Sequence, residues 1–182
     1  MTDAVEPHTL AGEKVVLRRV ERADVAELVR IRRTPEVHGR WGDVDADLDD
    51  GWPFDDPDTI IFTVLLGGSV TGLIQYWEER EPTHRNAGID IFLDPVVHGR
   101  GHGRDALRTL ARHLVRDRGH HRLVIDPAAD NEPAIRSYAA VGFRPVGVMR
   151  AYERDVDAET WHDALLMDLL ASDLDMGGDV KT

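Results

Sequence analysis

The feature that most constrains the fold is a run of alternating glycines that leads directly into an amphipathic helix. It reads His98-Gly99-Arg100-Gly101-His102-Gly103-Arg104 and lies between a strand predicted over 87–93 and a helix predicted over 102–118. Glycine lets the backbone approach a ligand closely, and the start of a helix presents unpaired N–H groups and a partial positive charge. The run therefore predicts an anion site, typical of phosphate groups, to which the arginines add charge. A tight turn with incidental glycines is the simpler alternative.

The other elements follow from apolar spacing and turn residues. The helix over 102–118 buries one face, because its apolar residues recur at i, i+3, i+4, i+7 and i+8 from Leu107. A second helix is expected from Asn131, which caps it, to Gly142, which ends it. A third is expected over 23–33, before Pro35. Strands are expected over 14–20, 59–66, 70–77, 123–125, 143–149 and 165–170.

The order of these elements predicts the fold class. Antiparallel hairpins are combined with one strand-helix-strand crossover, so we expect an α/β fold with helices packed on a mixed sheet. The stretch 41–58 contains eight aspartates together with glycine and proline, and we expect it to be a loop. With 182 residues the chain fits one domain, which we place at 13–171. Residues 1–12 and 172–182 lack apolar spacing and are expected to be flexible termini.

Charge and cysteine content exclude several classes of partner. The 22 basic and 34 acidic residues give a net charge of −12, which argues against nucleic acid and favours a cationic partner. No cysteine is present, so disulfides, thiolate metal sites and cysteine nucleophiles are excluded, and a cytoplasmic location is favoured. The histidines are scattered, so we expect no metal. No apolar run approaches the roughly 20 residues that cross a bilayer, so we expect no membrane association.

The phosphate ligand of the glycine run can be narrowed by exclusion. A P-loop requires Gly-Lys-Ser/Thr, which is absent. A dinucleotide fingerprint requires a third glycine where Arg104 stands. Asp126 ends the next strand, where a ribose-binding acid would lie, so this alternative stays open. The strands upstream of the run, and the short chain, argue against a doubled Rossmann sheet.

The glycine run resembles motif A of the GCN5-related N-acetyltransferases, the GNAT family, with Gly101 and Gly103 in the two glycine positions. It departs from that motif at His98, where glutamine or arginine is usual. The run from Asp126 to Phe143 is similar to the family's motif B, which lies at the matching distance downstream. The resemblance implies a mostly antiparallel mixed sheet with helices on both faces, and acetyl-coenzyme A as co-substrate.

The resemblance also assigns residues to the cofactor. The end of the strand over 87–93 is similar to the family's splayed strand, whose free backbone groups pair with pantetheine. The implied contacts are Ile91, Phe92, Leu93, His98, Gly99, Arg100, Gly101, His102, Gly103, Arg104, Asn131 and Ala134. Capping of the helix alone would also explain Asn131.

Two residues are candidates for the chemistry of acetyl transfer. Asp90 lies on the opposite face of its strand from Ile89 and Ile91, and the resemblance places an acidic substrate-binding or base residue here. A carboxylate with an ordinary pKa is a weak base for an amine, so burial or nearby acids must raise it if it is the base. Tyr138 is the candidate acid that protonates the leaving thiolate. Ion pairing of Asp90 with Arg85 or Arg154, and simple core packing of Tyr138, are the alternatives.

The acceptor is inferred from acidic and aromatic residues. Within the GNAT family the chain looks like the aminoglycoside 6′-N-acetyltransferase branch, which implies a polycationic amine. Trp41, Asp43, Trp52, Asp90 and Asp126 are the candidate substrate-binding residues. A protein N-terminus, a polyamine or a siderophore hydroxylysine is the alternative acceptor, and a non-catalytic module that binds coenzyme A is the alternative function. A monomer and a homodimer are both compatible with the sequence.

Overall fold

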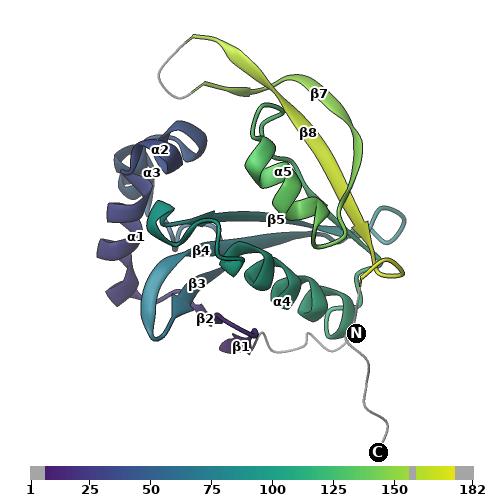
Figure 1. Ribbon diagram of the computed structural model, residues 1–182, viewed down its shortest axis with the longest axis horizontal. Helices are drawn as coiled ribbons and strands as arrows, with labels where there is room; N and C mark the ends of the chain where they lie inside the picture. Colours follow the sequence, from purple (N-terminus) through teal and green to yellow (C-terminus); the bar gives the residue numbers. More distant parts are fainter. Residues whose placement is uncertain (1–6, 156–158, 175–182) are drawn as a thin grey trace, which may run out of the picture.

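The computed structural model describes residues 7–155 and 159–174, and it shows a mixed sheet covered by helices (Figure 1). In these residues the sheet has eight strands, in the order β1-β2-β3-β4-β5-β6-β8-β7. Neighbouring strands are antiparallel except for β5 and β6, which are parallel. The predicted α/β fold, with a mostly antiparallel sheet and helices on both faces, is confirmed.

The strands have the following bounds: β1 Thr9–Ala11, β2 Val16–Arg19, β3 Ile60–Leu66, β4 Ser69–Glu79, β5 Asn86–Leu93, β6 Arg122–Ile125, β7 Arg144–Arg154 and β8 Trp161–Leu170. The α-helices are α1 Val25–Arg32, α2 Pro35–Trp41, α3 Val44–Asp50, α4 His102–Arg116 and α5 Glu132–Ala139. Two 3₁₀ turns, η1 Arg22–Asp24 and η2 Pro95–Val97, precede α1 and the glycine run.

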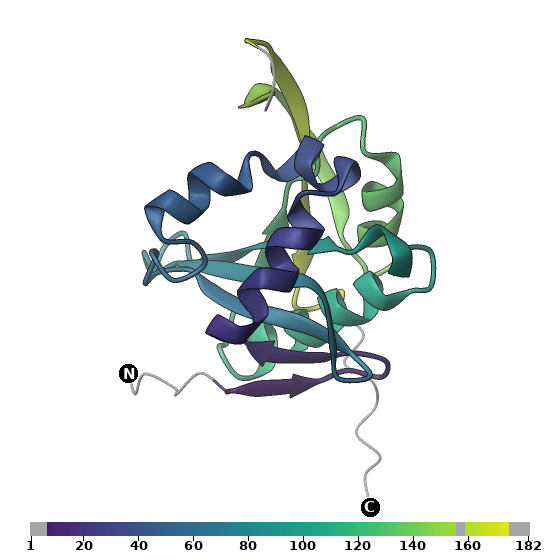
Figure 2. The same cartoon turned by 90° about the vertical axis from the view of Figure 1, so that its left-hand side faces the viewer.

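The two faces of the sheet carry separate apolar cores. On one face α4 packs Leu107, Leu110 and Leu114 against the inward residues of the central strands, and all three side chains are fully buried. On the other face, α1 and α2 contribute Leu28 and Val37 to a smaller cluster. Figure 2 shows α1, α2 and α3 gathered on this side of the molecule. The 3.6-residue period of α4 thus fixes which side of the sheet carries the larger core.

The sheet opens in the middle, and this opening positions the site. The parallel strands β5 and β6 pair only at Ala87 with Leu123 and at Gly88 with Val124. Beyond Gly88, β5 continues to Leu93 with β4 as its partner. The backbone groups of β5 that face away from β4 are therefore free to bind a ligand over its last residues.

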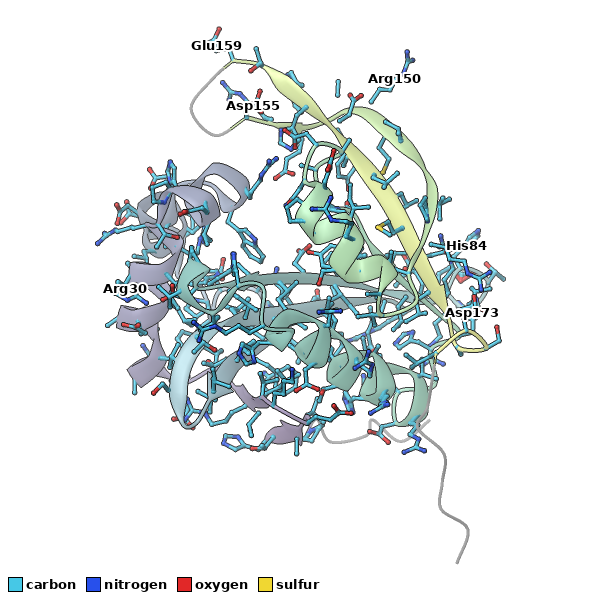
Figure 3. All side chains as sticks on the ribbon, in the orientation of Figure 1. Arg30, His84, Arg150, Asp155, Glu159 and Asp173 are labelled. Carbon is cyan, nitrogen blue, oxygen red and sulfur yellow. The ribbon has the colours of Figure 1, made fainter. Side chains whose placement is uncertain are left out.

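The β7–β8 hairpin extends well beyond the rest of the sheet (Figure 1). Ten of the eleven residues of β7 are exposed, because no helix covers the strand. Figure 3 shows Asp155 and Glu159 at the outer end of this hairpin. Its outer end reaches toward the side of the molecule where α2 and α3 lie (Figure 1).

The stretch 41–58 was expected to be a loop, and this expectation is wrong, because it contains the end of α2 and all of α3. The Asp43 side chain caps α3 by accepting a hydrogen bond from the backbone N of Asp45 at 2.9 Å. Asp45 and Asp47 lie in the first turn, where the positive end of the helix favours them, and Gly51 ends the helix at φ 105°. The aspartates that suggested a loop are the residues that favour a short helix.

Regular structure also extends into the terminal segments. Strand β1 lies in the segment 1–12, for which no regular structure was expected, and it pairs Leu10 with Leu17. In the segment 172–182, Leu174 is buried in the larger core. Residues 1–6 and 175–182 lie outside the described residues. Pro35, expected only to end a helix, also begins α2, where its fixed φ suits the first turn.

Candidate active site

A cleft of about 780 Å³ lies between the end of β5, the glycine run, α2 and α5. It brings together most residues that the sequence assigned to the cofactor, although these come from distant parts of the chain. Its lining includes Ile91, Phe92, Leu93, His98, Gly99, Gly101, His102, Gly103, Arg104, Asn131, Ala134 and Tyr138.

The glycine run forms one wall of this cleft in a conformation that requires glycine. Gly99 and Gly101 have φ of 75° and 83°, in the left-handed region, and Gly101 is the N-cap residue of α4. A Cβ on Gly103 would lie 3.3 Å from Leu93 Cδ1, so the run also packs tightly against β5. The first turn of α4 therefore faces the cleft with N–H groups available for an anion.

The back of the glycine run is held by the chain that enters β2. Asp105, in the first turn of α4, is 5% exposed, and its carboxylate accepts hydrogen bonds from the backbone N of Glu13, Lys14 and Val15 at 3.1, 2.7 and 3.0 Å. Lys14 Nζ donates to the carbonyl of Arg100 at 3.1 Å. Arg100 does not line the cleft, unlike the other residues of the run from His98 to Arg104.

The end of β5 and the start of α5 both line the cleft. His98 Nε2 donates a hydrogen bond to the carbonyl of Leu93 at 3.0 Å, which ties the glycine run to the end of β5. On the opposite side, Asn131 Oδ1 accepts a hydrogen bond from the backbone N of Ala134 at 3.3 Å, so the expected helix cap is confirmed. The cleft thus lies between a loop with free amides and a capped helix.

Tyr138 lies on α5 and lines the cleft. Burial, followed by the negative charges of Asp90 and Asp126, raises the pKa of Tyr138 above its ordinary value. Its ring also contacts that of Phe143, with centroids 6.5 Å apart. The hydroxyl of Tyr138 is therefore protonated at every working pH and is available as a hydrogen-bond or proton donor.

Asp90 lies on β5, directly opposite Gln75 on β4. Gln75 Nε2 donates a weak hydrogen bond to Asp90 Oδ2 at 3.3 Å. Burial, and then the negative charge of Asp126, raises the pKa of Asp90 to about 6. The suggested arginine partners are wrong, since Arg85 donates to the carbonyl of Arg118 and Arg154 lies exposed at the end of β7.

Asp126 forms an acidic pair with Asp90 across the opening between β5 and β6. Burial raises the pKa of Asp126, whereas a hydrogen bond from the Tyr152 hydroxyl opposes this shift. The same hydrogen bond raises the pKa of Tyr152. Two neighbouring carboxylates with raised pKa values favour binding of a cation, because a positive charge relieves their mutual repulsion.

The remaining candidates for substrate binding separate into two groups. Trp41 lines the cleft and also a smaller cavity of about 240 Å³, which Trp52 lines as well. Asp43 lines neither of these cavities and serves as the cap of α3. Of the acidic and aromatic stretch, the tryptophans thus lie beside the cleft and Asp43 does not.

Comparison with known proteins identifies the family. A sequence profile of the acetyltransferase (GNAT) family matches residues 25–143. The mycothiol acetyltransferase of Nocardia farcinica (strain IFM 10152) is 29% identical over 156 residues, which cover 80% of this chain and 50% of that protein. The chain belongs to the GNAT acetyltransferase family. It spans about half the length of this curated relative.

Solved GNAT structures share the fold at low sequence identity. RimJ of Mycobacterium smegmatis in complex with CoA-disulfide has a TM-score of 0.76 at 23% identity, covering 91% of this chain and 88% of that chain. A chimera of the spermidine N-acetyltransferase SpeG from Vibrio cholerae has a TM-score of 0.74 at 20% identity, covering 88% and 97%. AAC(6′)-Ib in complex with paromomycin and acetyl-CoA has a TM-score of 0.74 at 20% identity, covering 93% and 100%.

Membership of the GNAT family makes this cleft the candidate active site. The fit is physical as well, because a cleft lined by the glycine run and by the end of β5 suits a cofactor with phosphates and a thioester arm. Tyr138 lines this cleft, whereas Asp90 and Asp126 do not. Among the described residues, no three histidine, aspartate or glutamate side chains are placed to hold a metal ion. No helix in the described part is long and apolar enough to cross a membrane.

Three residues at this GNAT site were missed by sequence reasoning. Gln75 reaches Asp90 through the pairing of β4 with β5, and Tyr152 reaches Asp126 from β7. No local pattern in the sequence indicates either contact. Arg32 is 1% exposed and carried a signal, because it stands four residues after Leu28, on the apolar face of α1. An arginine at such a position predicts a buried charge with a dedicated partner.

Proposed function

We propose that the protein transfers the acetyl group of acetyl-coenzyme A to a primary amine of a cationic small molecule, such as an aminoglycoside. The observation that carries this proposal is the acidic pair of Asp90 and Asp126 with Tyr138 beside them. The pair is suited to bind an ammonium group, and Tyr138 is suited to donate a proton in the same site. The net charge of −12 would also attract a polycation.

In the proposed reaction the amine attacks the thioester directly. Asp90 holds the ammonium group and accepts one of its protons, directly or through water, because its pKa of about 6 leaves it ionised at neutral pH. The amine nitrogen then bonds to the thioester carbon, and the carbon–sulfur bond breaks. Tyr138 donates its proton to the leaving thiolate. The nitrogen loses two protons in all: the first passes from Asp90 to solvent, and the second, lost after the nitrogen–carbon bond forms, restores the proton of Tyr138. No covalent enzyme intermediate is needed.

The cofactor residues have distinct roles in this proposal. The amides of Gly99, Gly101 and Gly103 bind the pyrophosphate, with His98, His102 and Arg104 beside them. The free edge of β5 over 91–93 pairs with the pantetheine arm and supplies an amide for the developing oxyanion. Asn131 and Ala134 contact the arm from α5. Arg100, which does not line the cleft, supports the loop through its carbonyl, which accepts a hydrogen bond from Lys14 Nζ.

The test is release of coenzyme A, followed with a thiol reagent, after acetyl-coenzyme A is mixed with the protein and one acceptor. The chain has no cysteine, so the protein gives no background. The acceptors are a kanamycin-type aminoglycoside, a polyamine and an N-terminal peptide. Rapid release with the aminoglycoside supports the proposal, whereas release with only another acceptor replaces it.

A polyamine is the second candidate acceptor, since the spermidine acetyltransferase chimera shares the fold as closely as the aminoglycoside enzyme does. A module that binds coenzyme A without catalysis is the alternative of another class. It predicts no release with any acceptor, and unchanged affinity for coenzyme A in Asp90→Asn and Tyr138→Phe. A single domain, a cytoplasmic location and a monomer or homodimer belong to the same proposal, as do the absence of a metal and of a nucleic-acid partner.

A further inference from the structure

A second cavity, of about 240 Å³, lies against the GNAT site on the side of α1 and α3. Trp41 lines both this cavity and the large cleft, and Gln75 lines this cavity. The Trp41 ring is fixed at this position by an edge-on contact with Phe92, with centroids 4.8 Å apart. Because Gln75 also donates to Asp90, a single side chain joins the second cavity to the site of the attacking amine.

The walls of the second cavity carry an excess of negative charge. Its charged lining consists of Arg32, Asp47, Asp50 and Asp55. Arg32 pairs with Asp47, between Nη1 and Oδ2 at 2.5 Å. Within the described part of the chain, Asp50 and Asp55 form no ion pair and accept no hydrogen bond with their carboxylates. Two carboxylates therefore remain for an external cation.

Arg32 is the buried charged residue in the wall of this cavity. Its side chain is buried, and its guanidinium lies between the rings of Trp41 and Trp52, 5.8 and 5.1 Å from their centroids. It also donates to the carbonyls of Trp41 and Gly42. The rings of Trp41 and Trp52 that hold the guanidinium also line the cavity, and their faces suit stacking against the C–H groups of a hydroxylated ring.

We propose that the second cavity is a subsite for a second ammonium group of the acceptor, on a scaffold that also carries hydroxyl groups. The subsite rests on the proposed function, because it presumes that the reacting amine lies at Asp90. Asp50 and Asp55 bind the ammonium group, and the wall formed by Arg32, Trp41 and Trp52 accommodates a hydroxylated ring. The subsite makes the enzyme selective for polycationic amino alcohols over simple monoamines.

The test compares kanamycin with a monoamine on matched variants. Asp50→Asn/Asp55→Asn removes both free carboxylates, and Asp49→Asn is the control, since Asp49 is exposed on the same helix and does not line the cavity. Calorimetry with coenzyme A bound should show kanamycin affinity about tenfold weaker in the double variant and less than twofold weaker in the control. Affinity for coenzyme A should be unchanged in both.

Turnover is the second measurement, and it distinguishes failure of the subsite from failure of the proposed function. In the double variant the KM for kanamycin should rise about tenfold, while the rate with a monoamine such as ethanolamine stays within twofold of wild type. Equal effects of Asp49→Asn, no effect of the double variant, or no kanamycin binding by the wild-type protein would each overturn the subsite. Kanamycin binding that depends on Asp50 and Asp55, without any turnover, would overturn the proposed function and leave the subsite in place.

Discussion

At the scale of single residues, the acidity of Asp90 decides what the site can do. An isolated carboxylate titrates near pH 4 and is a poor base, whereas burial and the charge of Asp126 bring the pKa of Asp90 to about 6. In the proposed reaction the ionised form of Asp90 is the active one, so the rate should be constant above about pH 7 and fall about tenfold per pH unit well below 6. The pH dependence of kcat/KM between pH 5 and 8 measures this.

Replacement of the carboxylate should remove that acidic limb. We expect Asp90→Asn to lower kcat by about 100-fold or more at pH 7.5, because neither the ammonium contact nor the proton acceptor remains. Its residual rate should depend less on pH between 5 and 7. An Asp90→Asn enzyme that keeps both the wild-type rate and the wild-type pH profile would show that another group accepts the proton.

Tyr138 is expected to act on the leaving group. Tyr138→Phe should lower kcat by about 100-fold while the Kd for coenzyme A changes less than twofold, because the ring still packs against Phe143. Because the pKa of Tyr138 is raised, the wild-type rate should show no loss up to about pH 9. The loss in Tyr138→Phe should shrink with acetyl thioesters of more acidic thiols, since their thiolates need no acid to leave.

The matched control for this change is Tyr152→Phe. This variant also removes a hydroxyl near the acidic pair. The hydroxyl of Tyr152 contacts Asp126, however, and Tyr152 does not line the cleft. It should alter the acceptor KM more than kcat. Equal losses of kcat in both variants, independent of the thiol, would assign Tyr138 a role in packing alone.

At the scale of elements, the glycine run depends on its support from behind. Asp105 accepts three backbone hydrogen bonds from the chain before β2 and thereby holds the first turn of α4. Asp105→Asn replaces one acceptor oxygen with a donor, so we expect the free energy of unfolding to fall by about 2 kcal/mol. The Kd for coenzyme A should rise about tenfold. Urea unfolding and calorimetry measure the two effects.

Asp117→Asn provides the comparison at the other end of α4. There the carboxylate accepts only a hydrogen bond from His113 Nδ1, at 2.8 Å and far along the helix from the glycine run. It should leave the Kd for coenzyme A within twofold of wild type. If Asp105→Asn weakens stability without changing that Kd, the support is structural only.

The elements show why sequence reasoning succeeded in one region and failed in another. The helical period of 107–115 is set by burial of one face, and burial is the main determinant of structure, so α4 was predicted well. Helix α3 was missed because its stability comes from caps and first-turn acids, which in composition resemble a loop. Capping residues and first-turn acids predict a helix only when their exact spacing along the chain is considered.

Predictions for the site also succeeded for local features and failed for contacts between distant residues. The glycine run and Asn131 are local features, and their positions along the chain predicted their place in the cleft. The partners of Asp90 could not be predicted, because Gln75 reaches it through the register of β4 with β5. Asp43 caps α3 and lines neither cavity, so its role in substrate binding stays a prediction.

At the scale of the whole molecule, the opening between β5 and β6 divides the sheet. A cluster of charged side chains stabilises the sheet at the end of β4. At the end of β4, Glu78 accepts hydrogen bonds from Arg118 Nη2 at 2.7 Å and from His120 Nε2 at 2.8 Å. These residues follow α4, so the cluster fastens the crossover to the sheet far from the acidic pair. His120 is 2% exposed.

This cluster predicts how stability depends on pH. Burial alone would raise the pKa of Glu78, but the hydrogen bonds from Arg118 and His120 lower it to about 2. A group whose pKa is lowered by folding stabilises the protein above its unfolded pKa, and this contribution is lost as the pH falls toward the folded value. Burial also lowers the pKa of His120, so acidification below its ordinary value of 6.5 favours unfolding too. Both groups therefore act in the same direction.

We therefore expect the free energy of unfolding to decrease continuously as the pH is lowered from about 6.5 to 2. In Glu78→Gln it should be lower by about 2 kcal/mol at pH 7, and its decrease between pH 4.5 and 2 should be smaller. Glu79→Gln, on the exposed side of the same strand, should follow the wild type at every pH. Urea titrations at a series of pH values give these curves. Parallel curves for Glu78→Gln and wild type would mean that other carboxylates govern the acid sensitivity, because only a group that titrates differently in the folded state can change the slope.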